Sequence, residues 1–324
     1  MNAVLRRLGF YLVSAWASVT LDFAIPRLMP GDPAAALVAR FNGEMSPEAL
    51  RALRRAFGFV PGSTLTQYGS YVTHVARGDL GLSIAYFPAR VSDVIGTGLG
   101  WSLGLGGLAL LISFTLGTVL GVVAAWRRGG RLDSLLPPAL SFLGAFPYFW
   151  LAMLVLYLFG FTLRWFPLQH ARAPDLAGTS ALTLVADVAR HAVLPAAAVV
   201  LATLGGWMLT MRGSMLAVLG THAIKLATAK GLRPRRIMWA YAARNALLPS
   251  VTSLGMALGF VVSGSLLTEI VFSYPGLGYL LVQAVRNQDY PLLQGLFLMI
   301  TFSVLAANFL VDLVLIWLDP RARA

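Results

Sequence analysis

Long apolar runs alternate with short polar breaks along the whole chain. A helix that crosses about 30 Å of hydrocarbon needs about 20 predominantly apolar residues. Six runs come close to or exceed that length, at about 8–25, 101–126, 135–163, 192–211, 248–268 and 292–318. The pattern therefore predicts an all-α membrane protein with six transmembrane helices.

The first apolar run follows Arg6 and Arg7 and has some features of a secretory signal, because Ala15-Trp16-Ala17 fits a small-residue cleavage pattern. The run continues past that point, so we expect an uncleaved span. Asp22 lies inside it, and an acid within a span is a functional candidate by default. Because Asp22 is only a few residues from the outer end, we expect its side chain to be hydrated.

Proline residues interrupt the third run at Pro137, Pro138 and Pro147. Proline removes a backbone donor and often marks a kink, which neighbouring groups can compensate inside a membrane. We therefore expect one kinked span over about 135–163.

The longest polar stretch is residues 34–98. Ser46 and Pro47 are a helix start, as N-cap and first helical residue, and the helix should run to Phe57. A second helix is expected over about Thr66–Arg77, ended by Gly78. The chain thus divides into a first span at 1–29, a small external helical domain at 30–98, and a five-helix transmembrane core at 99–324.

A basic loop at 212–248 separates the fourth and fifth runs. Each Arg or Lys at the centre of a span costs about 2.5–3.5 kcal/mol, so the segment is a loop, and its charge assigns it to the cytoplasm. Residues 223–230 favour a short helix, Gly231 suits its C-terminal end, and Pro234 suits the start of the next helix. We call residues 222–236 the basic knob; Pro249 should mark the start of the fifth span. From the charge alone, a loop whose only role is to anchor the chain in the membrane is about as good an interpretation as a loop with a further function. The loop's basic residues are Arg212, Lys225, Lys230, Arg233, Arg235, Arg236 and Arg244.

Composition agrees with a membrane protein. The 324 residues are 58% hydrophobic and 12% charged, against about 45–50% and 25% in soluble domains. The net charge of +12 would also suit a nucleic-acid partner. The basic residues cluster at span ends instead: 14 lie in segments expected inside, 4 in the two short external loops, 6 in the external domain at 30–98, and Arg27 at the outer end of the first span. This bias places both termini in the cytoplasm.

The sequence lacks the residues for cysteine chemistry, for Walker-type ATP hydrolysis and for a recognisable metal site. The chain has no Cys, and neither of its two lysines follows the glycine of a Walker-type phosphate loop. His191 stands without a second His, Glu or Cys at metal spacing, and reads as an interface residue. We expect no enzymatic activity, no bound cofactor and no metal. Energy for active transport would have to come through the basic loop or from an ion gradient.

The basic loop resembles the cytoplasmic "EAA" loop of ABC importer permeases of the dipeptide, oligopeptide and nickel family. That loop runs D-Y-V-R-T-A-R-A-K-G-L-x-x-R-R and then R-N-A-L-x-P, and Lys225 stands for one of its arginines. His222, Ala223, Leu226 and Thr228 depart from the pattern. The matching residues are Ala227, Ala229, Lys230, Gly231, Leu232, Arg235, Arg236, Arg244, Asn245, Ala246, Leu247 and Pro249.

Further segments resemble the same family in the same order along the chain. A carboxylate at Glu269 would be costly in lipid, so it should face protein, backbone donors or the transport pathway. Pro275, Gly276 and Gly278 are expected to form a tight turn. The resemblance makes Glu269, Phe272, Pro275, Gly276 and Gly278 candidates for a pathway or gate. The matching segments are residues 30–33, 78–83, 146–150, 191–195, 269–278, 287–291 and 319–321.

The resemblance implies a permease subunit of an ABC importer in the bacterial cytoplasmic membrane. Its partners would be a second, homologous permease, two ATP-binding subunits or one fused ATPase, and an external substrate-binding lipoprotein. ATP and Mg would bind the ATPase partners. Di- and oligopeptides are the expected cargo, with nickel or oligosaccharides as alternatives. An ion-coupled secondary transporter and a membrane scaffold are the alternatives from other classes. The residues implied in coupling are His222, Lys225, Ala227, Lys230, Gly231, Arg235 and Arg236.

Overall fold

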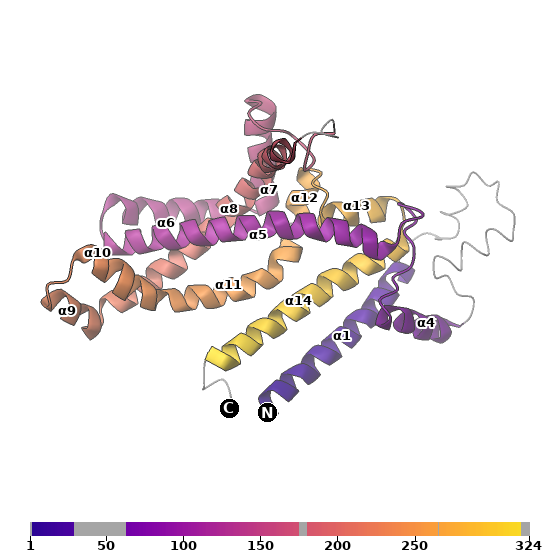
Figure 1. The fold of residues 1–324 in the computed structure, drawn as a ribbon, viewed down its shortest axis with the longest axis horizontal. Helices are drawn as coiled ribbons and strands as arrows, with labels where there is room; N and C mark the ends of the chain where they lie inside the picture. Colours follow the sequence, from indigo (N-terminus) through magenta and orange to yellow (C-terminus); the bar gives the residue numbers. More distant parts are fainter. Residues whose placement is uncertain (1, 29–62, 175–179, 265, 319–324) are drawn as a thin grey trace. The chain divides into compact units, whose positions relative to one another are not determined.

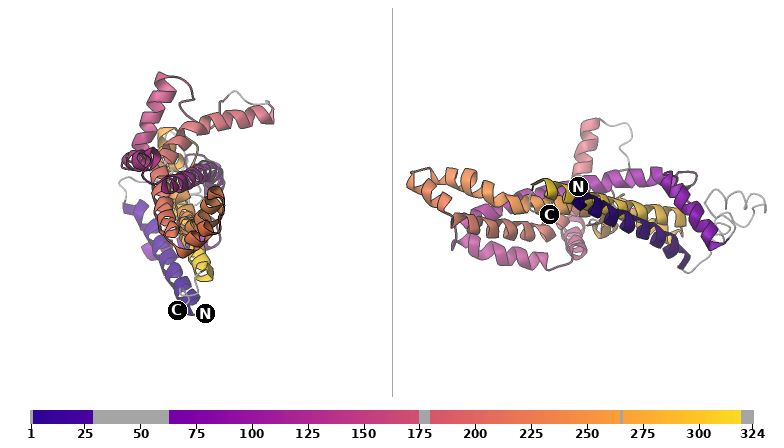
Figure 2. Two further views of the ribbon diagram at one scale, coloured as in Figure 1. Left: turned by 90° about the vertical axis from the view of Figure 1, so that its left-hand side faces the viewer. Right: turned by 90° about the horizontal axis from the view of Figure 1, so that it is seen from below.

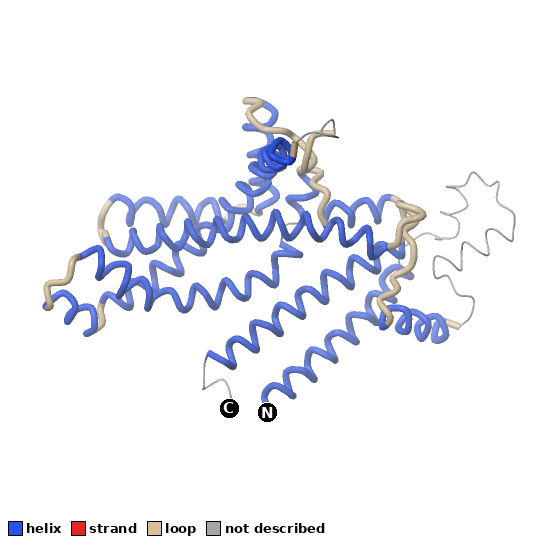
Figure 3. The backbone as a smooth tube through the Cα atoms, in the orientation of Figure 1, coloured by secondary structure: helices blue, strands red, loops and turns tan. Residues whose placement is uncertain are grey.

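The computed structural model describes residues 2–28, 63–174, 180–264 and 266–318 (Figure 1). Within these ranges the regular elements are helices, and the β pairing is a single isolated bridge between Leu82 and Arg90 (Figure 3). The all-α prediction is confirmed for this part of the chain. The chain forms two compact units, Met1–Ser102 with Pro275–Ala324, and Leu103–Tyr274. We call them unit 1 and unit 2.

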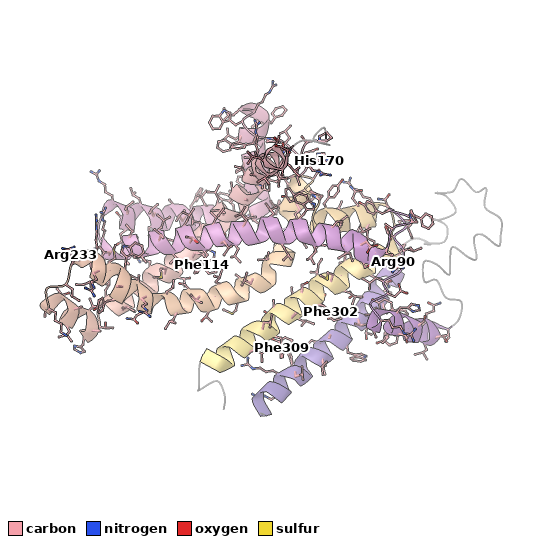
Figure 4. All side chains as sticks on the ribbon, in the orientation of Figure 1. Arg90, Phe114, His170, Arg233, Phe302 and Phe309 are labelled. Carbon is pink, nitrogen blue, oxygen red and sulfur yellow. The ribbon has the colours of Figure 1, made fainter. Side chains whose placement is uncertain are left out.

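Unit 1 is built on an antiparallel helix pair, α1 and α14, which lie side by side (Figure 1 and Figure 2). Arg7 Nη1 lies 2.6 Å from Asp312 Oδ1, and Tyr11 donates to the other carboxylate oxygen at 2.8 Å. The Tyr11 ring also meets Phe309 edge-on (Figure 4). The start of α1 and the end of α14 therefore lie at the same end of the pair. The helices of this unit are α1 Asn2–Leu28, α4 Thr64–Ala76, the first part of α5 Val91–Trp126, α13 Leu277–Arg286 and α14 Tyr290–Leu318.

Unit 2 contains the rest of α5 and a set of helices packed on the long helix α8. Glycines let α5 approach α8 closely: a Cβ on Gly121 would lie 2.6 Å from the carbonyl oxygen of Met208. Small residues of this kind are how helices pack inside membranes. The helices are α6 Arg131–Gly144, α7 Tyr148–Val155, π-helix η1 Leu156–Thr162, α8 Ala181–Leu219, α9 His222–Ala229, α10 Pro234–Arg236, π-helix η2 Ile237–Ala243, α11 Arg244–Gly264 and α12 Leu266–Val271.

Three helical segments of the described residues are long and apolar enough to cross a membrane alone: Val91–Trp126, Ala181–Leu219 and Tyr290–Leu310. The first has 36 residues, or about 54 Å at 1.5 Å per residue, so it extends beyond the hydrocarbon. The bent pair Arg131–Gly144 and Tyr148–Thr162 would make a fourth span. The chain is therefore a multi-pass membrane protein.

The third run has a sharp break where a kink was predicted, because its two helices meet at 98°. α6 continues through Pro137 and Pro138, and the break comes at Ala145–Pro147. Pro147 supplies it, since proline cannot donate the hydrogen bond that would continue the helix. Pro249 lies inside α11, which begins at Arg244.

The expectation of a hydrated Asp22 is wrong. Asp22 is only 5% exposed, and its Oδ2 atom has no hydrogen-bond partner among the described residues. The Gln294 side chain of α14 donates to the Asp22 carbonyl oxygen at 3.3 Å. In the segment predicted to be external, α4 confirms the second predicted helix, and Gly78 ends it at φ +72°. The helix predicted over Ser46–Phe57 lies outside the described residues.

Candidate functional site

The basic knob begins with α9. The apolar side of α9 packs against the other helices of unit 2, and its remaining sides are exposed. Ile224 and Ala227, three residues apart, are buried, whereas Lys225 and Leu226 are exposed. Burial of Ile224 contributes about 1.5–3 kcal/mol. The two side chains belong to a hydrophobic cluster that joins α9 to α5, α8, η2 and α11. Its buried members are Val122, Ala125, Met211, Met215, Ile224, Ala227, Ile237, Ala242, Ala243 and Ala246.

Gly231 ends α9 as the sequence predicts. Its φ is +71°, a backbone region that residues with a Cβ rarely adopt. Its N–H donates to Thr228 O at 2.9 Å, and the N–H of Leu232 donates to Ala227 O at 3.3 Å. These are the paired bonds of a Schellman motif. The glycine therefore fixes the direction in which the chain leaves α9.

The second part of the knob is continuous with the fifth apolar run. Arg233 caps α10 and Pro234 is its first residue, which confirms the predicted start. Helical conformation then continues through η2 into α11, to Gly264. The knob is thus joined to a long helix without a flexible connection. It lies at the end of unit 2 away from α7 and α12 (Figure 1).

The knob's positive charge is unpaired within the part of the chain that the structure describes. Lys225, Arg235 and Arg236 are exposed and form no ion pair there, and Arg233 reaches outward in the same way (Figure 4). Exposed apolar side chains lie among these cations, with Leu226 58% and Trp239 44% exposed. A surface that is both cationic and apolar suits a protein partner with an acidic rim.

Arg212, the first basic residue of the loop, does have a partner. Its Nε lies 2.6 Å from Asp133 Oδ1, and Asp133 Oδ2 accepts from Gly129 N at 3.0 Å. The Arg212 hydrogen bond, then the Gly129 N–H, lowers the pKa of Asp133, which precedes the third apolar run. The pair ties the turn between α5 and α6 to α8 at the knob's end of unit 2.

Asp133→Asn is expected to destabilise the protein at neutral pH by about 1 kcal/mol or less, since the pair is partly exposed. A lowered folded-state pKa means that the ionised carboxylate stabilises the fold above the unfolded pKa of about 3.9. That contribution is lost as the pH falls through the folded value. Thermal unfolding in detergent from pH 7 downward should show the wild-type advantage shrinking below about pH 4. A difference that does not depend on pH would contradict this account.

In unit 2, the gate candidates Glu269 and Phe272 are both buried. Glu269 lies in α12, where its carbonyl oxygen accepts from Tyr274 N at 2.8 Å. The Phe272 carbonyl oxygen accepts from His170 N at 3.0 Å, which holds the loop after η1 against this turn. Burial, then the Glu269 charge, raises the pKa of Tyr274 to about 12, so its phenol stays protonated at neutral pH. The expectation that Glu269 faces protein is confirmed.

In unit 1, the other gate candidates begin α13. Gly276 is its N-cap with φ −89°, and Gly278 lies inside its first turn. The predicted tight turn is therefore wrong for Gly278, and Ser273 has the positive φ, +47°, in its place. The N–H of Leu277 donates to the Ser102 hydroxyl at 2.8 Å. α13 thus packs directly on the start of α5.

Asp289 is a structural centre that sequence reasoning missed. It is fully buried and caps α14, accepting from Leu292 N at 3.1 Å. Its other oxygen accepts from the Ser83 hydroxyl at 2.5 Å and from Ala85 N at 2.8 Å. One carboxylate therefore attaches the loop before α5, at Ser83 and Ala85, to the start of α14. An Asp before Tyr290-Pro291 is a helix-start signal that could have found half of this role.

Replacement of Asp289 by Ala is expected to lower the apparent Tm in detergent by about 5 °C or more. Each buried donor left without an acceptor costs about 1–3 kcal/mol, and each kcal/mol moves Tm by about 2–4 °C in a chain of this size. Asp93→Ala, at an exposed acid in the first turn of α5, is the control and should change Tm little. Equal Tm values for the two variants would show that the Asp289 bonds do not hold the loop.

His191 lies buried in α8, with its Nδ1 2.9 Å from the Asp187 carbonyl oxygen one turn earlier. The ring also lies 3.4 Å from an Asp187 carboxylate oxygen. The described residues contain no group of three His, Asp or Glu side chains that could hold a metal ion. His191 is therefore accounted for by its helix neighbour.

Known proteins resemble this chain over its whole length. A di/tripeptide transport system permease protein, DppB, of Pseudomonas aeruginosa is 32% identical, covering 100% of this chain and 99% of the relative. A putative peptide permease protein of Brucella suis is 34% identical over 98% of each chain. An oligopeptide transport system permease protein, OppB, of Haemophilus influenzae is 31% identical over 100% of this chain and 99% of the relative.

The family description "binding-protein-dependent transport system inner membrane component" matches residues 117–324. That range contains α6 to α14, and hence the basic knob and all the gate candidates. The apolar helices agree with the family match and the full-length relatives, since the family is one of membrane components. The chain belongs to the family of binding-protein-dependent transport system inner membrane components.

Proposed function

We propose that this chain is the permease subunit of an ATP-driven ABC importer that moves di- and oligopeptides delivered by an external substrate-binding protein. The observation that carries the proposal is full-length similarity, at 31–34% identity, to relatives named for di/tripeptide, peptide and oligopeptide transport. Nickel or oligosaccharides remain the alternative cargo within the same class.

The proposed topology has six spans with both termini in the cytoplasm. Arg7 and Asp312 form an ion pair at the start of α1 and near the end of α14, which brings these two helix ends to the same side. An even number of spans between them agrees with that arrangement. The excess of Lys and Arg in the assigned internal segments supports the same orientation.

The partners are a second, homologous permease, two ATP-binding subunits or one fused ATPase, and an external substrate-binding lipoprotein. This chain has no Walker-type phosphate loop, so ATP and Mg bind the ATPase partners. The basic knob, residues 222–236, docks on an ATPase subunit. Its exposed cations and the exposed Leu226 supply the charge and the apolar contact for that interface.

The knob transmits force because it is stiff at both of its ends. Gly231 and its two hydrogen bonds fix the turn after α9, while the buried cluster around Ile224 holds α9 against unit 2. The unbroken helix from Pro234 to Gly264 then carries a displacement into the membrane. Closure of the ATPase subunits is a rigid-body switch, and it needs a stiff coupling element of this kind.

The external domain, 30–98, contacts the substrate-binding protein. Asp289 attaches its last loop to α14 through Ser83 and Ala85. Contact with the binding protein is thereby linked to the membrane helices of unit 1 rather than to a free loop.

Uptake by the reconstituted importer tests this function. The chain, its second permease and the ATPases are placed in liposomes with the binding protein, and labelled di- and tripeptide uptake is measured with and without ATP. We expect ATP-dependent peptide uptake that survives an ionophore, and no ATP hydrolysis by this chain alone. Uptake of nickel or oligosaccharide only would overturn the cargo, and uptake abolished by the ionophore would favour an ion-coupled transporter.

A further inference from the structure

Unit 2 contains a cavity of about 430 Å³ between α5, α7, α8 and α11. Its volume falls in the range of about 300–1,000 Å³ typical of small-molecule sites. None of the predicted gate candidates lines it. The lining residues are Gly106, Leu110, Tyr148, Val199, Thr203, Gly206, Trp207, Thr210, Ala257 and Val261.

The cavity wall is apolar but has hydroxyl groups at three places and carries no charge. Thr203 and Thr210 come from α8, and Tyr148 begins α7. The Thr203 hydroxyl donates to the Val199 carbonyl oxygen at 2.8 Å, so it accepts from the Ser113 hydroxyl of α5, also at 2.8 Å, and both bonds fix its position. The indole of Trp207 is held edge-on by Phe114, with ring centroids 5.3 Å apart.

The α8 side of the cavity differs from the faces that suit lipid. Thr203, Gly206 and Thr210 recur at spacings of three and four, so they share one helix face, and all three are exposed. Exposed positions on α5 carry large apolar side chains instead, such as Leu111 and Leu116, at 54% and 48%. A hydroxyl gains little from hydrocarbon, because it finds no further partner there. This face therefore suits contact with a polar ligand.

Neighbouring glycines on α8 do different things. A Cβ on Gly205 would lie 2.7 Å from the Leu140 carbonyl oxygen, so that glycine is needed for packing against α6. A Cβ on Gly206 would meet nothing within 4 Å. Gly206 therefore leaves space in the cavity without serving the packing of unit 2.

We infer that this cavity is a substrate chamber along the transport pathway, and that it takes an uncharged portion of a peptide. The inference rests on the proposed function and adds to it the place at which the peptide binds. A peptide group leaving water needs both a donor and an acceptor. The Thr203 hydroxyl, which donates to Val199 O, can still accept from a peptide N–H, and the Thr210 and Tyr148 hydroxyls can donate to a peptide carbonyl. Trp207 and the aliphatic wall hold an apolar side chain. A charged side chain gains no counter-charge from the wall.

Gly206→Phe tests the chamber, because a Cβ at Gly206 would meet no atom within 4 Å and the ring beyond it would occupy the cavity. Gly104→Phe is the matched control: it lies on an exposed face of α5, also with open space, and outside the cavity. We expect Gly206→Phe to lower ATP-driven dipeptide uptake at least tenfold, while the second permease and the ATPases still co-purify. Gly104→Phe should transport within twofold of wild type.

Gly206→Ala and Thr203→Val refine the test. The smaller filling of Gly206→Ala should reduce uptake of Trp-containing dipeptides more than that of Ala-Ala, and Thr203→Val should raise the KM for both. Normal uptake by Gly206→Phe would overturn the chamber and leave the proposed function standing. Loss of the second permease from Gly206→Phe would also overturn it, since the face would then be a helix-packing surface. A wild-type importer that takes up no peptide would overturn the proposed function and the chamber together.

Discussion

Replacing Gly231 by Val is expected to uncouple the importer, with ATP-driven peptide uptake falling at least tenfold. At φ +71° the valine Cβ is strained, by about 1–2 kcal/mol for an ordinary residue and more for a β-branched one. The chain relieves that strain by giving up the bonds to Thr228 O and Ala227 O. α9 then loses its fixed direction relative to α11, and motion of an ATPase subunit no longer reaches the membrane helices.

The matched control is Gly220→Val, because Gly220 lies just before α9, as Gly231 lies just after it, but has φ −76°. A Cβ there would make ordinary contact, 3.6 Å from the Ala217 carbonyl oxygen. The measurements are uptake in liposomes and ATP hydrolysis stimulated by the binding protein, each normalised to the amount of assembled complex. Equal transport by Gly231→Val and Gly220→Val would contradict the claim that coupling needs a fixed turn at Gly231.

Reversing Arg235 and Arg236 to Glu is expected to reduce co-purification of the ATPase subunits at least tenfold. Both residues are exposed and form no ion pair among the described residues, so their charge is available to a partner. The double variant replaces attraction to an acidic rim by repulsion, and like charges at an interface cost several kcal/mol. The loss should be partly visible for wild type as well when the salt concentration is raised.

The control for this variant reverses Arg172 and Arg286, two exposed residues in segments expected outside the cell. It makes the same change in net charge, so any general effect on solubility or membrane insertion is matched. Co-purification should remain within twofold of wild type. Equal retention of the ATPases by both double variants would refute a docking role for the knob.

Features set by local sequence could be predicted closely. The end of α9 at Gly231 and the start of α10 at Pro234 follow from the backbone conformations that glycine and proline favour. Helix α4 and its stop at Gly78 follow for the same reason. Pro147 signalled a break, but the 98° angle comes from how the two flanking helices pack on other elements.

Features that depend on distant partners could not be predicted. Asp289 and Ser83 are 206 residues apart, and Asp22 and Gln294 are 272 apart. Sequence spacing gives no sign of either contact. The attachment of the Ser83 loop to Asp289 was therefore missed, and the Asp22 side chain was expected in water. The π-helical segments also had no signal, since Ile237–Ala243 reads as ordinary helix. The cavity was missed because its wall is assembled from four helices, each unremarkable alone.

The most direct test of the account is a cross-link from α9 to the ATPase, which a chain without native cysteine makes straightforward. Ala223→Cys places one thiol on the exposed side of the helix, and Arg172→Cys is the control in a segment expected outside. In the assembled importer, a short thiol-directed cross-linker with a photoreactive end should join the Ala223→Cys chain to an ATPase subunit, with a yield that changes on ATP binding. The control should give no such product. A thiol at position 223 that reacts with water-soluble maleimide at full rate in the assembled complex, and never cross-links to an ATPase subunit, would contradict force transmission through the basic knob.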